Sequence, residues 1–139
     1  MALIDASNLI LGRMASLVAQ RLLKGEMINI INAEKTIISG RRDTTFERYQ
    51  KYVQRGSREF GPMFPRRPEQ IVARTIRGMI PHTTTTGREA YSRLRVHIGV
   101  PPELSKEQAD TLEGASITRL STANYTVLGD LSKKLGSKF

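Results

Sequence analysis

Residues 27–40 read MINIINAEKTIISG and contain two short apolar runs, residues 27–31 and residues 36–39. Both runs are rich in Ile, and the polar sequence Asn-Ala-Glu-Lys separates them. Short continuous apolar runs are typical of strands that are buried on both faces, as in a parallel sheet covered by helices. We therefore expect two buried strands of an α/β fold here, the second ending at Gly40.

The sequence before this stretch predicts a strand followed by a helix. Residues 2–6 are apolar and are followed by Ser and Asn, which suits a first strand that ends in a turn. Residues 12–23 place Met14, Val18 and Leu22 at four-residue spacing, which is the pattern of a helix with one buried face.

Two further helices and a fourth strand are expected in the middle of the chain. The helices cover residues 43–54 and a segment that begins at Pro68, because Pro favours the first position of a helix. The strand covers residues 94–98, where apolar and basic residues alternate. The connecting residues 55–67 and 82–87 are rich in Gly, Pro, Arg or Thr and predict exposed loops.

The helix that begins at Pro68 has two distinct faces in this interpretation. Val72, Ile76 and Met79, together with a threonine between them, form an apolar stripe. Arg74 and Arg77 face the other way.

The last third of the chain has a mixed-charge composition and a weaker pattern. Ser105 and Gln108 have the spacing of a capping box and predict a short helix, and residues 128–135 predict a last turn or two of helix. The order strand–helix–strand–strand–helix–helix–strand indicates a three-layer α/β domain with a mostly parallel sheet.

The charge of the chain indicates a polyanionic partner. The net charge is +9, and the isoelectric point is near 10.4. Between Arg41 and Arg95 there are 13 basic residues and 5 acidic ones, and 12 of the 13 are Arg. Arginine binds phosphate with a planar fork and stacks on bases, so this segment favours nucleic acid over a merely solvated basic face or an anionic membrane surface.

Composition excludes several classes of protein. The absence of cysteine excludes a disulfide framework, a zinc ribbon, an iron–sulfur site and a thiol nucleophile. No apolar run approaches the roughly 18 residues that span a bilayer, and the first residues lack the order of a signal peptide. With 139 residues, 39% of them hydrophobic, we expect one soluble, untargeted domain with a single core.

The sequence offers little for a catalytic, metal or nucleotide site. No Gly-rich dinucleotide or phosphate loop follows the first strand, although Arg13 and the free N–H groups of its helix suit one phosphate. His82 and His97 lack metal-ligand spacing, and His82 is better placed as an RNA contact than as a base. Asp5 suits a turn cap better than an active-site carboxylate. We expect no enzyme, no bound metal, no cofactor and no small-molecule substrate.

Several segments, in order and with compatible spacing, resemble the L-thirteen family of large-subunit ribosomal proteins. They are GRMAS at residues 12–16, IINAEKTIISG at residues 30–40, RTIRGMIP at residues 74–81, and GR and LRVHIG at residues 87–88 and 94–99. The resemblance covers roughly residues 3–102 and is of the archaeal or eukaryotic type.

This resemblance implies a fold and a function. The fold is a three-layer α/β/α domain with a four-stranded, mostly parallel sheet, comprising residues 1–102 with a basic loop at about residues 55–67. Residues 103–139 are then a C-terminal extension that packs on the domain or on the ribosome. The implied role is structural: the protein binds and stabilises large-subunit rRNA beside neighbouring ribosomal proteins, in the cytoplasm, and supports subunit assembly and translation.

The basic residues acquire roles in that setting. Phosphate contacts are expected from Arg41, Arg42, Lys51, Arg55, Arg58, Arg66 and Arg67. Arg74 and Arg77 are expected to straddle neighbouring phosphates, with hydroxyls from the threonine run, Thr84 among them, and Arg88 closing the patch. Tyr52, Phe60 and Phe64 lie among these cations, and an exposed ring there either stacks on an unpaired base or packs in the core.

Two other interpretations remain open at this point. A basic nucleic-acid-binding module outside the ribosome predicts little preference for folded rRNA. A nucleotide-dependent enzyme predicts a saturable small ligand.

Overall fold

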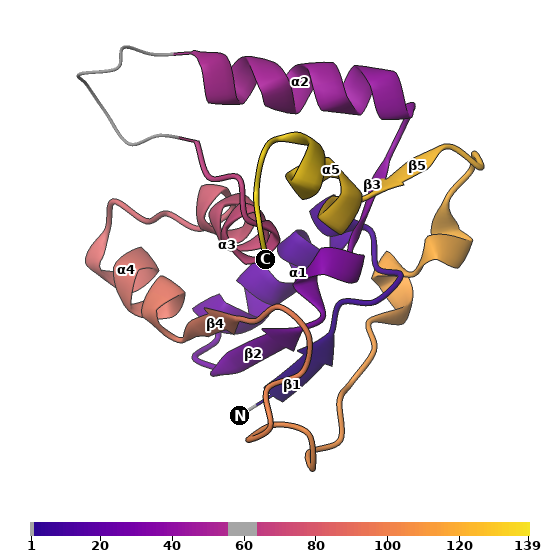
Figure 1. Cartoon of the computed structure of the whole chain (residues 1–139). Helices are drawn as coiled ribbons and strands as arrows, with labels where there is room; N and C mark the ends of the chain where they lie inside the picture. Colours follow the sequence, from indigo (N-terminus) through magenta and orange to yellow (C-terminus); the bar gives the residue numbers. More distant parts are fainter. Residues whose placement is uncertain (1, 56–63) are drawn as a thin grey trace.

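A small parallel sheet lies at the base of the molecule in the computed structural model, which describes residues 2–55 and 64–139 (Figure 1). Its strands are β1 (Ala2–Asp5), β2 (Ile28–Ile31) and β4 (Leu94–Val96), in the order β1-β2-β4. Both strand pairs are parallel, and the register places Ile30 of β2 between Ile4 and Val96. The α/β class and the parallel sheet predicted from sequence are confirmed.

The strand β3 (Ile37–Ser39) does not belong to this sheet. It pairs antiparallel with β5 (Tyr125–Val127), a strand that the sequence analysis did not predict. Between β2 and β3 the chain turns through Asn32, whose φ is 57°, and the 3₁₀ turn η1 (Ala33–Lys35), and this turn directs β3 away from β2. The structure therefore has three parallel strands and a separate antiparallel pair where sequence analysis expected four strands in one sheet.

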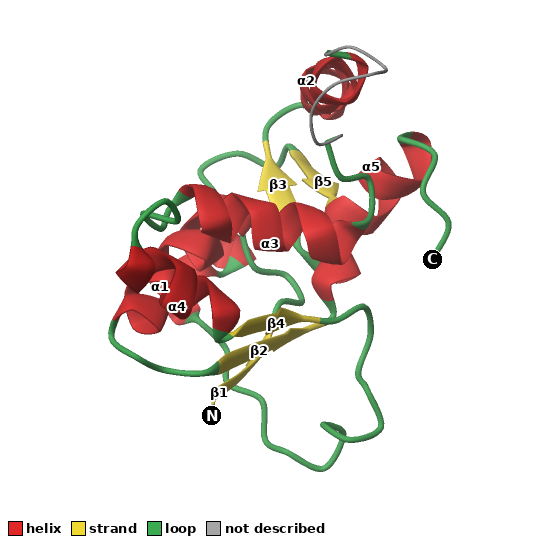
Figure 2. Ribbon diagram, turned by 90° about the vertical axis from the view of Figure 1, so that its left-hand side faces the viewer, coloured by secondary structure: helices red, strands yellow, loops and turns green. Residues whose placement is uncertain are grey.

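The helix α1 (Leu11–Leu23) connects β1 to β2 and carries the largest part of the core. Met14, Val18 and Leu22 are fully buried, as their spacing predicted. The helix α3 (Pro68–Gly78) packs across α1 through Val72 and Ile76. Figure 2 shows α1, α3 and α4 (Thr85–Ser92) on the same side of the parallel sheet.

The sequence analysis missed one helix and predicted another that does not form. Residues 82–87 are not all loop, because α4 begins at Thr85. No helix begins at Ser105, whose hydroxyl donates a hydrogen bond to the Pro102 carbonyl in a series of turns. The predicted stripe of α3 also needs one correction, since Met79 lies beyond the end of the helix and is 44% exposed.

The C-terminal residues complete the same core. The helix α5 (Leu128–Lys134) buries Leu128 and Leu131, and Leu135 follows them into the cluster. The hydroxyl of Ser132 donates a hydrogen bond to the main-chain carbonyl of Arg66, so α5 is tied to the segment that leads into α3.

The helix α2 (Arg42–Gln54) is the most peripheral element and forms the upper edge of Figure 1. Only Thr45 and Tyr49 are buried on it, and it packs against β5. None of the helices in the described ranges is long and apolar enough to cross a membrane.

Candidate nucleic-acid interface

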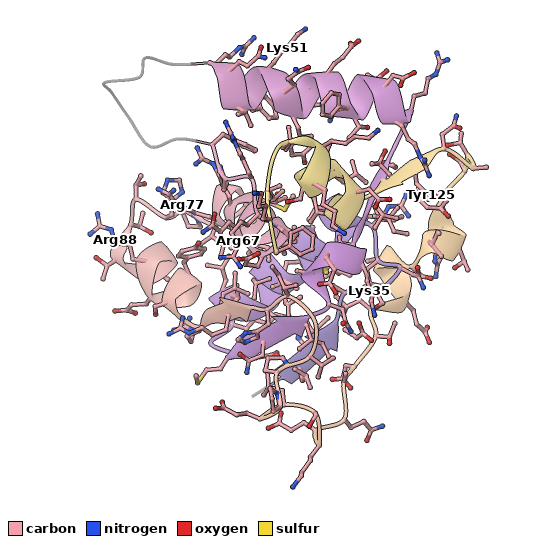
Figure 3. The ribbon with its side chains drawn as sticks, viewed as in Figure 1. Lys35, Lys51, Arg67, Arg77, Arg88 and Tyr125 are labelled. Atoms are coloured by element: carbon pink, nitrogen blue, oxygen red, sulfur yellow. The ribbon has the colours of Figure 1, made fainter. Side chains whose placement is uncertain are left out.

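The two ends of α2 carry separate groups of cations. Arg41 is the N-cap residue and Arg42 begins the helix, whereas Lys51 lies in its last turn and Arg55 follows it. All four side chains are exposed. A helix of 13 residues is about 20 Å long. The first two arginines therefore lie well apart from Arg55, and Lys51 projects from the outer side of α2 in Figure 3.

The helix α3 presents a second row of arginines. Pro68 occupies a position in its first turn, as predicted, and Arg66 and Arg67 lie exposed just before it. Arg74 and Arg77 are also exposed, because the opposite face of α3 buries Ile71, Val72 and Ile76. The prediction that Arg74 and Arg77 face away from the core is confirmed.

Three hollows with shared lining residues lie between the end of α2 and α3. One of about 310 Å³ is lined by Tyr52, Arg55, Phe64 and Arg74. Arg74 also lines a second hollow of about 270 Å³, with Arg77, Gly78 and His82. Phe64 also lines a third of about 400 Å³, with Val53, Pro65, Arg66, Arg67 and Gln70. We call this continuous region the arginine surface: Tyr52, Arg55, Phe64, Arg66, Arg67, Arg74, Arg77 and His82.

Three aromatic rings stiffen the arginine surface. The ring centroids of Tyr52 and Phe64 are 5.2 Å apart, and Tyr49 lies 5.7 Å from the first and 5.9 Å from the second. Tyr49 is buried beneath them, and burial raises the pKa of its hydroxyl despite the nearby Arg48 cation. The guanidinium of Arg74 lies 5.3 Å from the centre of the Phe64 ring, in a cation–π contact.

Most of the positive charge on the arginine surface has no acidic partner. Within the described ranges the ion pairs are Arg21 with Glu26 and Arg67 with Glu69, at 2.8 Å and 2.9 Å. Arg55, Arg66, Arg74 and Arg77 therefore carry charge that no carboxylate of the described chain neutralises. Unpaired cations side by side repel one another, so this arrangement favours a polyanion.

A further cationic hollow of about 400 Å³ lies at the start of α1. Arg13 and Arg48 line it, with Ser39, Tyr49 and Thr75 among the other lining residues. No side chain caps the first turn of α1, and no acidic residue lies in that turn. Helical N–H groups and two guanidinium groups are suited to an anion, and the predicted phosphate contact of Arg13 stays a prediction.

Arg48 was missed by the sequence analysis, although a signal was present. Arg48 lies in the arginine-rich segment between Arg41 and Arg95 and four residues before Tyr52 on α2. It was not among the residues from which phosphate contacts were expected.

The threonine run has a structural task. The hydroxyl of Thr84 donates to the Pro81 carbonyl at 2.8 Å and accepts from the Gly87 N–H at 3.1 Å, capping α4. The hydroxyl proton of Thr84 is thus donated to a main-chain carbonyl, and the predicted contact of Thr84 with RNA gains no support. Arg88 is exposed, although its guanidinium also donates to the Thr83 carbonyl at 3.2 Å.

Two predicted contact residues are not placed with the rest. Arg58 and Phe60 lie outside the described residues. His82 is partly buried and lines the hollow beside Arg77, and Figure 3 shows Arg77 and Arg88 on the same side of the molecule.

Asp5 acts as a turn cap rather than as part of a catalytic pair. Its carboxylate accepts from the Ser7 N–H at 2.9 Å and from the Asn32 side chain at 3.0 Å. Burial alone raises the pKa of this carboxyl, but those hydrogen bonds and the Lys35 charge outweigh burial and hold the pKa below its ordinary value. In the described ranges no three His, Asp or Glu side chains gather as metal ligands do.

The arginine surface and α1 belong to a region with a known sequence profile. The profile of the family described as "Ribosomal protein L13" matches residues 1–103. The chain belongs to this family. The resemblance drawn from the sequence motifs over roughly residues 3–102 is therefore confirmed.

Relatives of this L13 chain extend the similarity beyond residue 103. "Large ribosomal subunit protein uL13" of Methanococcoides burtonii is 50% identical over 139 residues, and that of Methanosarcina barkeri is 53% identical over 140; both alignments cover 100% of each chain. The protein of the same name from Archaeoglobus fulgidus is 49% identical over 96% of this chain and 86% of its own length. The C-terminal residues, which carried little of the motif resemblance, thus align as well.

Proposed function

We propose that this chain is a structural constituent of the large ribosomal subunit, where it binds and stabilises large-subunit rRNA and supports assembly and translation. Its partners are that rRNA and neighbouring ribosomal proteins, and its role is structural rather than catalytic. The observation that carries the proposal is the arginine surface, a row of exposed guanidinium groups of which Arg67 alone has a carboxylate partner among the described residues. Membership of the L13 family and the names of the relatives agree with it.

The proposed contacts divide into a central and a peripheral set. Arg55, Arg66, Arg67, Arg74, Arg77 and His82 line adjoining hollows and form the central set. The peripheral set consists of Arg13, Arg41, Arg42, Lys51 and Arg88, with Thr84 as the cap of the helix that carries Arg88. Arg58 lies outside the described residues and stays a predicted contact that belongs to neither set. Guanidinium groups in a row follow the phosphates of a folded RNA surface without reading its sequence.

Two finer structural predictions belong to the same proposal. Residues 1–102 form the rRNA-binding domain, and residues 103–139 form an extension that packs on it, an arrangement supported by Leu128 and Leu131 in the shared core. The three-layer α/β/α arrangement with a four-stranded sheet stays a prediction, because the parallel bridge between Ile10 and Ile37 joins β3 to the chain after β1 and not to a strand of the parallel sheet.

A charge reversal at the centre of the arginine surface tests the proposed function. Arg74→Glu with Arg77→Glu weakens binding to a large-subunit rRNA transcript strongly, because two phosphate contacts become repulsions. The slope of log K against log salt also falls by about two, at about one unit for each lost phosphate contact. Filter binding at several salt concentrations measures both quantities.

The control for this test has the same change in charge at a distance. Lys106→Glu with Arg119→Glu alters two exposed cations outside the arginine surface and is expected to keep most of the affinity and the slope. Circular dichroism checks that both double variants fold. Equal losses in the two variants, or no loss in the first, would contradict the proposed use of this surface.

A further inference from the structure

The hollow formed by Tyr52, Arg55, Phe64 and Arg74 differs from the rest of the arginine surface in having aromatic walls. Two of its four lining side chains are rings and two are guanidinium groups. Among the residues that the structure describes, no carboxylate or amide side chain lines it. Its chemistry is therefore suited to a ligand that is both planar and anionic.

Tyr52 is held in place although its ring is accessible. Tyr52 is 41% exposed, a large fraction for an aromatic residue that packs against two other rings. The rings of Tyr49 and Phe64 pack beside the Tyr52 ring at centroid distances of 5.7 Å and 5.2 Å, and Tyr49 is buried. A ring that is already fixed loses little conformational entropy when a ligand stacks on its free surface.

The arginines of the hollow suit the anionic groups of the same ligand. The guanidinium carbon of Arg74 lies 5.3 Å from the centre of the Phe64 ring, and this cation–π contact holds the arginine beside the aromatic wall. Arg55 follows the last residue of α2 and lies in the same hollow. Neither arginine has an ion pair within the described ranges, so both remain available for phosphates on either side of a stacked base.

We propose that this hollow takes one unpaired nucleotide of RNA, whose base stacks on Tyr52 and whose flanking phosphates bind Arg55 and Arg74. The inference rests on the proposed rRNA-binding function and adds the kind of RNA that this part of the surface takes: an unstacked base from a loop or bulge rather than a duplex. Within the described part of the chain, the arginines and the tyrosine hydroxyl are the hydrogen-bonding groups that line the hollow, so the stacking site is expected to tolerate any base.

The first experiment measures the affinity of Tyr52 variants for a large-subunit rRNA transcript. Tyr52→Ala is expected to weaken binding about tenfold, the effect of losing one base–aromatic stack, without changing the salt slope because no charge is lost. Tyr52→Phe keeps the ring and is expected to bind like the wild type. Tyr125→Ala is the matched control, because this tyrosine lies on β5, away from the arginine surface (Figure 3).

The second experiment separates stacking from charge with the full-length protein. Single-stranded oligoadenylate is compared with an abasic ribose-phosphate chain of the same length. The wild type is expected to bind the oligoadenylate about tenfold more tightly, and Tyr52→Ala is expected to bind both chains equally.

The outcomes distinguish this inference from the proposed function. Failure of the wild type to bind the rRNA transcript overturns both. Normal rRNA binding by the wild type and by Tyr52→Ala, with equal affinity for the two single-stranded chains, overturns the stacking site alone. Stronger competition by polyglutamate than by oligoadenylate at equal charge also overturns it, since the hollow would then take an acidic peptide.

Discussion

Gly87 is fixed by the way in which the chain enters α4. A Cβ atom at this position would overlap the carbonyl oxygen and carbon of Pro81. The same carbonyl accepts hydrogen bonds from both the main chain and the side chain of Thr84. Pro81, Thr84 and Gly87 thus form one compact turn, which places Arg88 at the edge of the arginine surface.

Gly87→Ala is expected to lower the free energy of unfolding by about 2–3 kcal/mol, because the backbone must move to admit the methyl group. Chemical denaturation measures this change. Gly12→Ala is the control, because a Cβ atom at this position meets nothing within 4 Å. The substitution also replaces a glycine within α1 by a better helix former. That control is expected to be neutral or slightly stabilising. A fully stable Gly87→Ala protein would contradict the close approach to Pro81.

At the scale of elements, α5 is part of the central core although it is formed by the last residues of the chain. Leu131 is 1% exposed, and a Cβ on Gly129 would lie 2.9 Å from the Glu34 carbonyl oxygen. The side chain of Glu34 in turn accepts a hydrogen bond from the Gly99 N–H at 3.0 Å. The helix α5 therefore packs against the turn η1, which joins β2 to β3, and stabilises it.

Leu131→Ala is expected to cost about 2–5 kcal/mol of unfolding free energy, the usual range for a leucine truncated in a packed core. The neighbouring Lys133→Ala is expected to change it by about 0.5 kcal/mol or less, because that side chain is exposed. Thermal and urea unfolding of both variants provide the measurement. Equal stability of the two variants would show that residues 128–139 pack only loosely on the domain.

The elements differ in how well their sequences predicted them. The helix α1 and the strand β2 were predicted because burial alone fixes their apolar spacing. The helix α4 was missed because threonines dominate its beginning, and only the Thr84 cap and the Gly87 contact reveal why it forms there. The strand β5 was missed because its partner β3 lies far away in the sequence.

The candidate site was predictable in composition but not in arrangement. The excess of arginine between Arg41 and Arg95 indicated the segment that supplies most of the arginine surface. The grouping of Arg55 with Arg74, and the separation of both from Arg41, depend on the tertiary fold, which brings the end of α2 to the same hollow as α3. Sequence periodicity describes one helix at a time and therefore does not predict which two helices share a hollow.

At the scale of the whole molecule, charge is distributed unevenly. The helices α2 and α3, which carry net positive charge, and α4, which carries Arg88, occupy the upper and left parts of Figure 1, and the connection after β4 forms its lower edge. That connection carries the acidic residues Glu103, Glu107, Asp110 and Glu113 against one lysine. An asymmetric field of this kind turns a protein so that its basic side meets a polyanion first. We therefore expect the arginine surface to face the rRNA.

The most direct test of the rRNA-binding account is the sedimentation of this protein in a native lysate, followed by mass spectrometry across a sucrose gradient. If the protein is a structural constituent of the large subunit, it sediments with that subunit and stays there in moderately high salt. Gradients with and without magnesium depletion check that it follows the large subunit itself. Confinement of the protein to the light fractions would contradict the account, because a structural constituent of the large subunit does not remain free when intact subunits are present.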